Sequence, residues 1–251
     1  MNEEPRRPDL SDWRTLELLR GALRLYHRNA PTFLGVAAAA FALTALIQAA
    51  STLSGLTEMS RLFLSLVALL VAGTGSLALA RAILRRLRGQ PASMEEAYGF
   101  ILERLSSYLG LLLVMAAIAL GVGIVGFMAG GIFLSLGLGP LGSAVVAALM
   151  LVAVVALALV PFGFAEGLPV MTSLERSQAL AWDEWPALLV NVGLYAVPFA
   201  ISFWLLPAEP WGMVVDMLIT VAYTPLPLAF LGMIYLRALG PDTPPSTADN
   251  A

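Results

Sequence analysis

The sequence contains no cysteine, no lysine and a single histidine, His27. The lack of cysteine excludes disulfide bonds, thiolate metal ligands and a thiol nucleophile. One histidine provides no cluster for a metal ion, and His27 lies outside the apolar runs where an intramembrane Ser/His enzyme would need it. HExxH, GxSxG and P-loop patterns are also missing. We therefore expect no metal, no cofactor and no catalytic residue.

Charge is equally scarce. Only 12% of the residues are charged and 59% are hydrophobic, whereas a soluble domain usually has about 25% charged residues. A water-soluble fold of 251 residues does not hide so much apolar surface, so the lipid bilayer is the natural solvent. The composition predicts an all-α, polytopic membrane protein.

Long stretches without charge mark the predicted membrane spans. They run over 29–57, 62–80, 105–165, 185–208 and 217–236. A spanning helix needs about 20 apolar residues, so 105–165 must hold two helices, broken by turn residues within 128–142. The sequence therefore predicts six transmembrane helices, at 31–52, 62–83, 107–128, 142–164, 186–206 and 214–236.

The placement of arginine predicts the orientation. Of the 14 basic residues, only Arg61 falls on the side opposite to all others. Cytoplasmic loops carry the excess of arginine and lysine, so we expect a multi-pass plasma-membrane protein with both termini in the cytoplasm. The same rule explains the basic loops without a nucleic-acid partner. Residues 1–9 and 241–251 are polar or rich in Pro, Ser and Thr, and are expected to be disordered tails around a membrane domain at 10–240.

The cytoplasmic segments are predicted to form three amphipathic surface helices. In 10–26, apolar residues recur at helical spacing and arginines line the other face, which suits anionic lipid head groups. The second and third segments contain Ser93-x-x-Glu96 and Thr172-x-x-Glu175. Each matches a capping box, in which side chains bind the free N–H groups of a first helical turn.

The junctions between surface helices and spans favour a threefold internal repeat. Pro31, Ser106 and Pro186 occupy equivalent places, separated by 75 (106 − 31) and 80 (186 − 106) residues. Proline suits the first turn of a helix, where its missing N–H costs nothing. The repeats would cover about 10–83, 92–164 and 172–237. The alternative is that any six-span protein with amphipathic loops shows such a pattern.

Several short motifs resemble a known family. They are Glu166-Gly167, Ser173-Leu-Glu-Arg176-Ser177, Ala179-Leu180 with Trp185, Ile234-Tyr235-Leu236-Arg237, and Leu23-Arg-Leu-Tyr26. Together they resemble a six-helix bacterial and archaeal membrane family, related to the membrane domain of some glycerophosphoryl diester phosphodiesterases and including YciC-like proteins of unknown function. The resemblance implies the six-helix fold. It implies no activity, because this chain contains no phosphodiesterase domain.

Glu166 is the most conspicuous polar residue, because it lies where the fourth predicted span ends. An ionisable group at membrane depth suggests function by default. Its predicted partner is Arg176, with Arg237 as a further candidate. The favoured interpretation is structural, an ion pair that fixes the third surface helix.

A polar pocket between the fifth and sixth spans is a second candidate site. Prolines interrupt both spans, and broken helices near the membrane midplane can build substrate sites. The pocket would be lined by Asn191, Tyr195, Tyr223 and Thr224, beside Pro225. The alternative is two kinked helices that only pack together, since proline is common in membrane spans.

Three functions remain open on these grounds. The favoured one is a non-enzymatic structural, assembly or lipid-organising protein that contacts anionic head groups. The second is a small transporter or channel for a hydrophobic or lipid-like solute, because the scarcity of charge within spans disfavours ion-coupled transport. The third is an enzyme acting on lipid head groups. The Gly126-x-x-x-Gly130 motif leaves a homo-oligomer or membrane-protein partner open.

Overall fold

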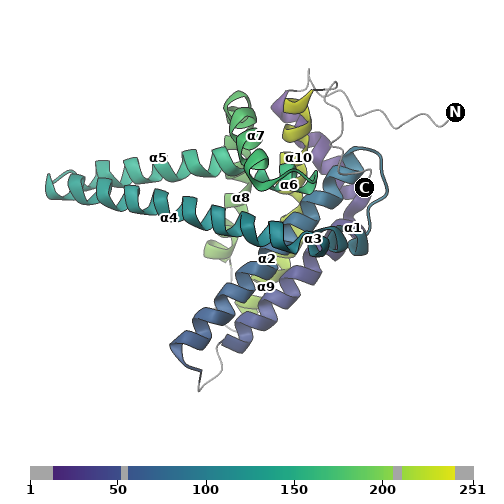
Figure 1. Cartoon of the computed structure of the whole chain (residues 1–251), viewed down its shortest axis with the longest axis horizontal. Coiled ribbons are helices and arrows are strands. Elements are labelled where there is room, and N and C mark those ends of the chain that lie inside the picture. The colour runs from purple at the N-terminus through teal and green to yellow at the C-terminus, as the bar shows by residue number, and fades with distance from the viewer. Residues whose placement is uncertain (1–13, 52–55, 206–210, 241–251) are drawn as a thin grey trace.

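The computed structural model describes residues 14–51, 56–205 and 211–240, which are helical and contain no strand. Figure 1 shows the arrangement. The helices are α1 (Thr15–Ser51), α2 (Glu58–Leu87), α3 (Met94–Glu103), α4 (Leu105–Ser135), α5 (Gly139–Leu157), α6 (Val160–Ala165), α7 (Val170–Asp183), α8 (Trp185–Leu205), α9 (Trp211–Tyr223) and α10 (Pro225–Leu239). The predicted tails and residues 10–13 of the first surface helix lie outside the described residues.

Five helical segments among the described residues are long and apolar enough to cross a membrane. They are α1, α2, α4, the run Gly139–Ala165 that comprises α5 and α6, and the run Leu218–Leu239. The fifth predicted span, 186–206, falls on α8, whose apolar segment Trp185–Pro198 is shorter. Phe127 is 83% exposed and Leu113 is 72% exposed on α4. Such large apolar surfaces call for an apolar surrounding, so the structure is typical of a membrane protein. A membrane span at α8, which would bring the total to six, stays a prediction.

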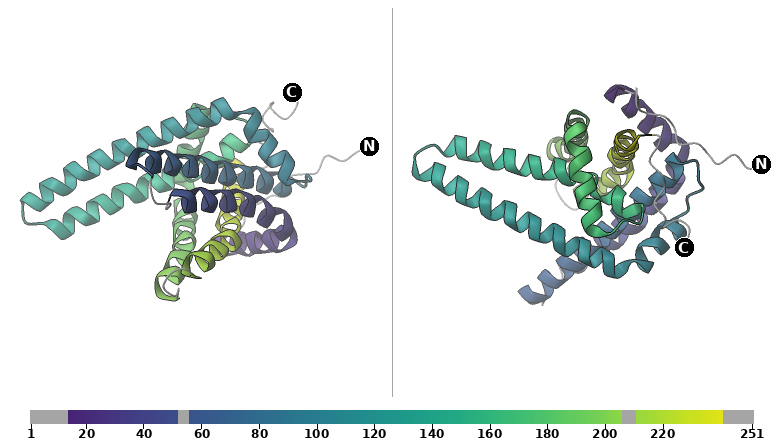
Figure 2. Two further views of the ribbon diagram at one scale, coloured as in Figure 1. Left: turned by 90° about the horizontal axis from the view of Figure 1, so that it is seen from below. Right: turned by 45° about the horizontal axis from the view of Figure 1, so that its top comes forward.

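Three helical hairpins diverge from a shared end (Figures 1 and 2). They are α1 with α2, α4 with α5, and α8 with α9. In each hairpin the second helix leads back to the shared end, and we call the segment that arrives there the returning helix. The returning helices are residues 77–87 of α2, α6 after α5, and α10 after α9. These three segments hold most of the buried core. We call the shared end, together with α3 and α7, the hub.

The three returning helices pack together around Gly232 of α10. A Cβ atom at Gly232 would lie 2.9 Å from Ile83 Cγ2, 3.0 Å from Phe162 Cε1 and 3.2 Å from Leu87 Cδ1. The ring of Phe162 stacks on that of Tyr235 with centroids 5.8 Å apart. The close approach of α2, α6 and α10 therefore depends on the missing side chain at this position.

Similar backbone breaks precede three of the long helices. Asn29 (φ −118°, ψ 17°) interrupts α1, Arg104 (φ −108°, ψ 26°) separates α3 from α4, and Glu184 (φ −106°, ψ 9°) separates α7 from α8. All three lie near the bridge region of backbone space. Each comes two residues before Pro31, Ser106 or Pro186. The breaks thus fall at the positions that the predicted repeat makes equivalent; the repeat itself stays a prediction.

One predicted helix start is present and one is wrong. The backbone N–H of Glu96 donates to Ser93 Oγ (3.1 Å), so Ser93 caps α3. Thr172, in contrast, lies inside α7, which begins at Val170 after Pro169. Pro169 is the N-terminal cap of α7 and has no backbone N–H that needs a partner. Its carbonyl accepts a hydrogen bond from Ser173 Oγ (3.0 Å). The helix therefore begins before the predicted capping box.

Two predicted spans differ from the helices observed. α4 continues to Ser135, beyond its predicted end at 128, because membrane helices tolerate glycines such as Gly130. The sixth predicted span is two helices, since Pro225 lacks an N–H and its ring clashes with the preceding turn. α9 accordingly ends at Tyr223 and α10 begins at Pro225.

The Gly126-x-x-x-Gly130 motif packs within one hairpin. Cβ atoms added at Gly126 and Gly130 would lie 3.4 Å and 3.6 Å from the side chain of Val146 on α5. The two glycines thus bring α4 close to α5 of the same chain. A partner protein at this motif stays a prediction.

Candidate functional site

The polar contacts of the hub concentrate on the turn that ends α6. α6 ends at Ala165, Glu166 is its C-terminal cap, and Gly167 has the left-handed φ of 90°. Glycine adopts this conformation without a steric penalty and often ends helices. Carbonyl groups at a helix C-terminus lack partners within the helix, so they are available to donors from other elements.

Glu166 accepts hydrogen bonds from three separate elements. Its side chain is buried, with 2% of the residue exposed. Arg88, which follows α2, pairs with Oε1. Arg176 Nη1 on α7 lies 3.1 Å from Oε2, and the Tyr235 hydroxyl on α10 donates to the same oxygen (2.8 Å). Both carboxylate oxygens are therefore engaged.

Arginines also bind the carbonyl groups on either side of Glu166. Arg81 Nη1 donates to the carbonyl of Ala165 (2.8 Å), and Arg104 Nη2 donates to that of Gly167 (2.7 Å). These positive groups also offset the partial negative charge of the α6 C-terminus. We call this arrangement the clasp. It consists of Ala165, Glu166, Gly167, Arg81, Arg88, Arg104, Arg176 and Tyr235.

Two further glutamates balance part of the positive charge around the clasp. Glu96 of α3 accepts from Arg81 Nε (3.2 Å) and pairs with Arg85 (2.7 Å). Glu184, at the break between α7 and α8, accepts from Arg237 Nε (2.9 Å). Buried charges are stable only when they are paired and hydrogen-bonded, so these pairs also fix how α3 and α8 join the hub.

Ser177 completes the hub at the break between α5 and α6. Its hydroxyl donates to the carbonyl of Ala156 (2.7 Å) and accepts from the N–H of Leu159 (3.2 Å). Pro161 lacks the N–H that would continue the helix. One buried side chain of α7 thus satisfies two backbone groups where the returning helix is interrupted.

The predicted contact between Glu166 and Arg176 is present, and the structure adds partners that sequence reasoning missed. The ion pair of Arg237 is with Glu184. The missed clasp residues are Arg81, Arg88, Arg104 and Tyr235. A signal existed for two of them, because Arg81, Arg85 and Arg88 are spaced i, i+4, i+7 and so share one helix face.

A cavity of ≈ 580 Å³ lies between the α4/α5 hairpin and helices α8 and α10. Asn191 and Tyr195 of α8 are part of its wall. Tyr223 and Thr224 lie at the junction of α9 and α10, where the Thr224 hydroxyl donates to the carbonyl of Thr220 (2.6 Å). The predicted pocket between the fifth and sixth spans is therefore displaced, because α4 and α5 supply nearly half of the lining residues.

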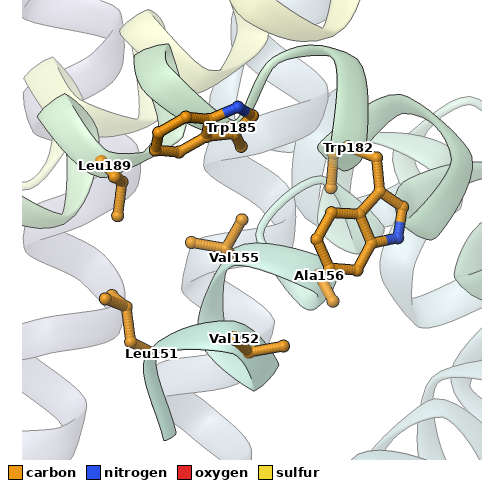
Figure 3. A pocket seen from close by; sticks show the side chains of 8 residues that line it. Leu151, Val152, Val155, Ala156, Trp182, Trp185 and Leu189 are labelled. Carbon is orange, nitrogen blue, oxygen red and sulfur yellow. The ribbon is translucent and has the colours of Figure 1, made fainter. Parts of the chain in front are cut away.

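A smaller pocket of ≈ 210 Å³ lies where α5 meets α7 and α8. Figure 3 shows the indoles of Trp182 and Trp185 beside it, with Val152, Val155 and Ala156 of α5. Both tryptophans are more than half exposed. Exposed tryptophan is typical of the boundary between membrane and water, and this pair lies next to the hub.

Compared with protein-family models, curated proteins and solved structures, the chain has no match. In the part of the chain that the structure describes, no group of three or more His, Cys, Asp or Glu side chains could hold a metal ion.

Proposed function

We propose that this protein is a non-enzymatic integral membrane protein, in which the clasp fixes three transmembrane hairpins and the hub organises lipid at one membrane surface. The observation that carries the proposal is the bonding of Glu166. Its two oxygens accept from Arg88, Arg176 and Tyr235, which belong to three different parts of the chain.

The geometry of Glu166 supports a structural role over a catalytic one. A general acid or base must come within hydrogen-bond distance of a substrate proton. Glu166 is only 2% exposed, and the surrounding arginines and tyrosine occupy both of its oxygens. The same groups hold the ends of α2, α6 and α10 together, which is the task of a structural junction.

We also propose the finer architecture of six spans in three repeats. The similar breaks at Asn29, Arg104 and Glu184 support it, as does the convergence of three returning helices at Gly232. The motifs that resemble the six-helix family agree with this arrangement, since Glu166, Arg176 and Tyr235 meet in the clasp. A relation to that family is part of the proposal.

We propose that the hub lies on the cytoplasmic side of the plasma membrane; the concentration of arginine in the hub supports this orientation. Reporter fusions after residue 240 and before residue 14 should both report a cytoplasmic location, because six spans return the chain to its starting side. A fusion within the α4–α5 turn at Gly137 should report the opposite side. An external C-terminus would rule out this topology.

The first part of α1 supports contact with anionic lipid. Leu16, Arg20, Leu23, Arg24 and His27 are all exposed and share one face of the helix. Leucines among arginines let a helix sink its apolar groups into the head-group region while its cations meet lipid phosphates. The opposite face, with Leu18 and Ala22, is buried in the core.

Replacing Arg20 and Arg24 together with glutamine should weaken retention of anionic lipid. Each basic residue near a membrane surface contributes about 1 kcal/mol, so the double variant should bind phosphatidylglycerol about tenfold to thirtyfold more weakly. Native mass spectrometry of the purified protein with titrated phosphatidylglycerol measures this. Arg61→Gln, at the far end of the α1/α2 hairpin, is the control and should retain wild-type binding. Equal binding by the double variant would contradict the lipid-organising role.

The larger cavity favours a second candidate function, the binding or passage of a hydrophobic solute. The specific observation is the buried amide of Asn191 in a mainly apolar wall. This candidate does not depend on the clasp.

A further inference from the structure

The wall of the larger cavity contains no charged side chain among its described residues. It is made of apolar side chains, mostly from α4, α5, α8 and α10 with Pro161 of α6, and its polar exceptions are Ser76, Asn191 and Tyr195. Its volume of ≈ 580 Å³ falls within the range of roughly 300–1,000 Å³ typical of small-molecule sites. A charged group would be costly in these surroundings, so the wall selects a neutral, mainly apolar occupant.

Asn191 is the polar group that needs a partner. It is only 3% exposed, and its side-chain oxygen is buried without a hydrogen bond. A buried amide in this condition is destabilising unless water or a ligand binds it. Ser76 already donates to the carbonyl of Ala72 (3.1 Å) within its own helix. Tyr195 lies one helical turn after Asn191 on the same face of α8, so two groups capable of hydrogen bonding line one side of the cavity.

The depth of Asn191 limits the kind of ligand. Asn191 follows Trp185 by six residues (191 − 185), which is about 9 Å along a helix that rises about 1.5 Å per residue. With Trp185 at the boundary of the membrane, Asn191 lies at most about 9 Å below that boundary, in a leaflet whose hydrocarbon is about 15 Å thick. A large or charged head group would remain at the boundary, whereas a small hydroxyl group can reach this level.

We propose that the cavity binds a neutral lipid-like amphiphile, such as a diacylglycerol, whose hydroxyl group hydrogen-bonds to Asn191 while an acyl chain occupies the space between α4, α5 and α8. The amide can both donate to and accept from a hydroxyl group. Tyr195 provides a second hydroxyl beside it. This inference deepens the second candidate function proposed above, since it names the solute class, and it is independent of the clasp.

Photolabelling tests the inference. The full chain is purified in detergent and irradiated with a diacylglycerol that carries a diazirine in one acyl chain, and labelled residues are mapped by mass spectrometry. Saturable labelling should centre on the cavity wall, at residues such as Met115, Met150 and Leu157. Unlabelled diacylglycerol should compete at lower concentration than phosphatidylglycerol or hexadecane. Labelling spread evenly over outward residues such as Phe127, or equal competition by hexadecane, would overturn the proposal.

Asn191→Leu isolates the hydrogen bond. The substitution keeps the branching at Cγ and removes the unsatisfied amide, so the variant should fold, and its affinity for the labelled diacylglycerol should fall about tenfold. Gln48→Leu, which removes an exposed amide from α1, is the matched control and should bind as the wild type does. Wild-type affinity in Asn191→Leu would overturn the proposal. If that variant does not fold, the positions labelled in the wild-type protein decide whether the cavity is the binding site. If the protein binds diacylglycerol but does not move it between the leaflets of proteoliposomes, the result would support the binding site and exclude transport.

Discussion

Glu166→Gln is expected to produce the largest loss of stability of any single charge-removing substitution in the hub. The change removes the negative charge opposite Arg88, which is 7% exposed, and opposite the partly buried Arg176. Leaving one partner of a buried ion pair without its counter-charge typically costs about 3–5 kcal/mol. Glutamine can keep a hydrogen bond to Tyr235 but cannot neutralise the arginines. The variant should therefore give much less folded protein.

Thermal unfolding in detergent, followed by size-exclusion chromatography, measures this loss. Glu175→Gln provides the matched control, since it removes the same charge from an exposed residue of α7 next to Arg176. The control should unfold at the wild-type temperature, because exposed charges contribute at most about 1 kcal/mol. A wild-type yield and unfolding temperature for Glu166→Gln would show that Glu166 has no structural role.

Gly232→Leu should be the second most damaging change. Ile83, Phe162 and Leu87 leave no room for a side chain there, and the nearest of these atoms, Ile83 Cγ2, is on a β-branched residue that cannot swing away easily. Overpacking a close-packed core commonly costs about 1–3 kcal/mol, sometimes more. Because α2, α6 and α10 would all have to separate, we expect a loss at the upper end of this range.

The same substitution at Gly110 is the control for helix propensity and added hydrophobicity. A Cβ atom at Gly110 of α4 would meet nothing within 4 Å, and leucine is a better helix former than glycine. Gly110→Leu should thus melt at or above the wild-type temperature, whereas Gly232→Leu should melt well below it. Equal melting of the two variants would contradict the convergence of returning helices at Gly232.

Composition and the spacing of charges were enough to predict the helical membrane architecture. Runs without charge located all five helical segments long enough to span a membrane, because a bilayer imposes a minimum length and excludes charge. Local chemistry also placed the Ser93 cap. The capping pattern at Thr172 did not mark the start of α7, because Pro169 caps the helix three residues earlier.

The partners within the clasp could not be predicted from the sequence in the same way. Arg81, Arg88 and Arg104 bind a turn that is 63 to 84 residues away along the chain. The excess of arginine indicates a membrane side, but it does not say which carbonyl or carboxylate each arginine reaches. That depends on how the hairpins meet.

The cavity shows the same limit. The sequence predicts a shared pocket for Asn191 and Tyr195 because they are close together in the chain, and both line the cavity. The sequence does not indicate that α4 and α5 form the facing wall of the cavity. Tyr223 and Thr224 are predicted to line the pocket because they are close to Pro225 in the sequence, but they lie at the junction of α9 and α10. The order of spans along the chain does not fix which hairpins face one another.

A double-mutant cycle between Glu166 and Arg88 tests the central claim most directly. Glu166→Leu, Arg88→Met and the double variant are compared with the wild type by thermal unfolding. If the clasp holds the hairpins through this pair, the double variant should lose about 1–3 kcal/mol less stability than the two single variants lose when their losses are added. The reason is that the double variant leaves neither charge buried alone. Strictly additive losses would show that Glu166 and Arg88 act independently, and would contradict the clasp as the junction of the fold.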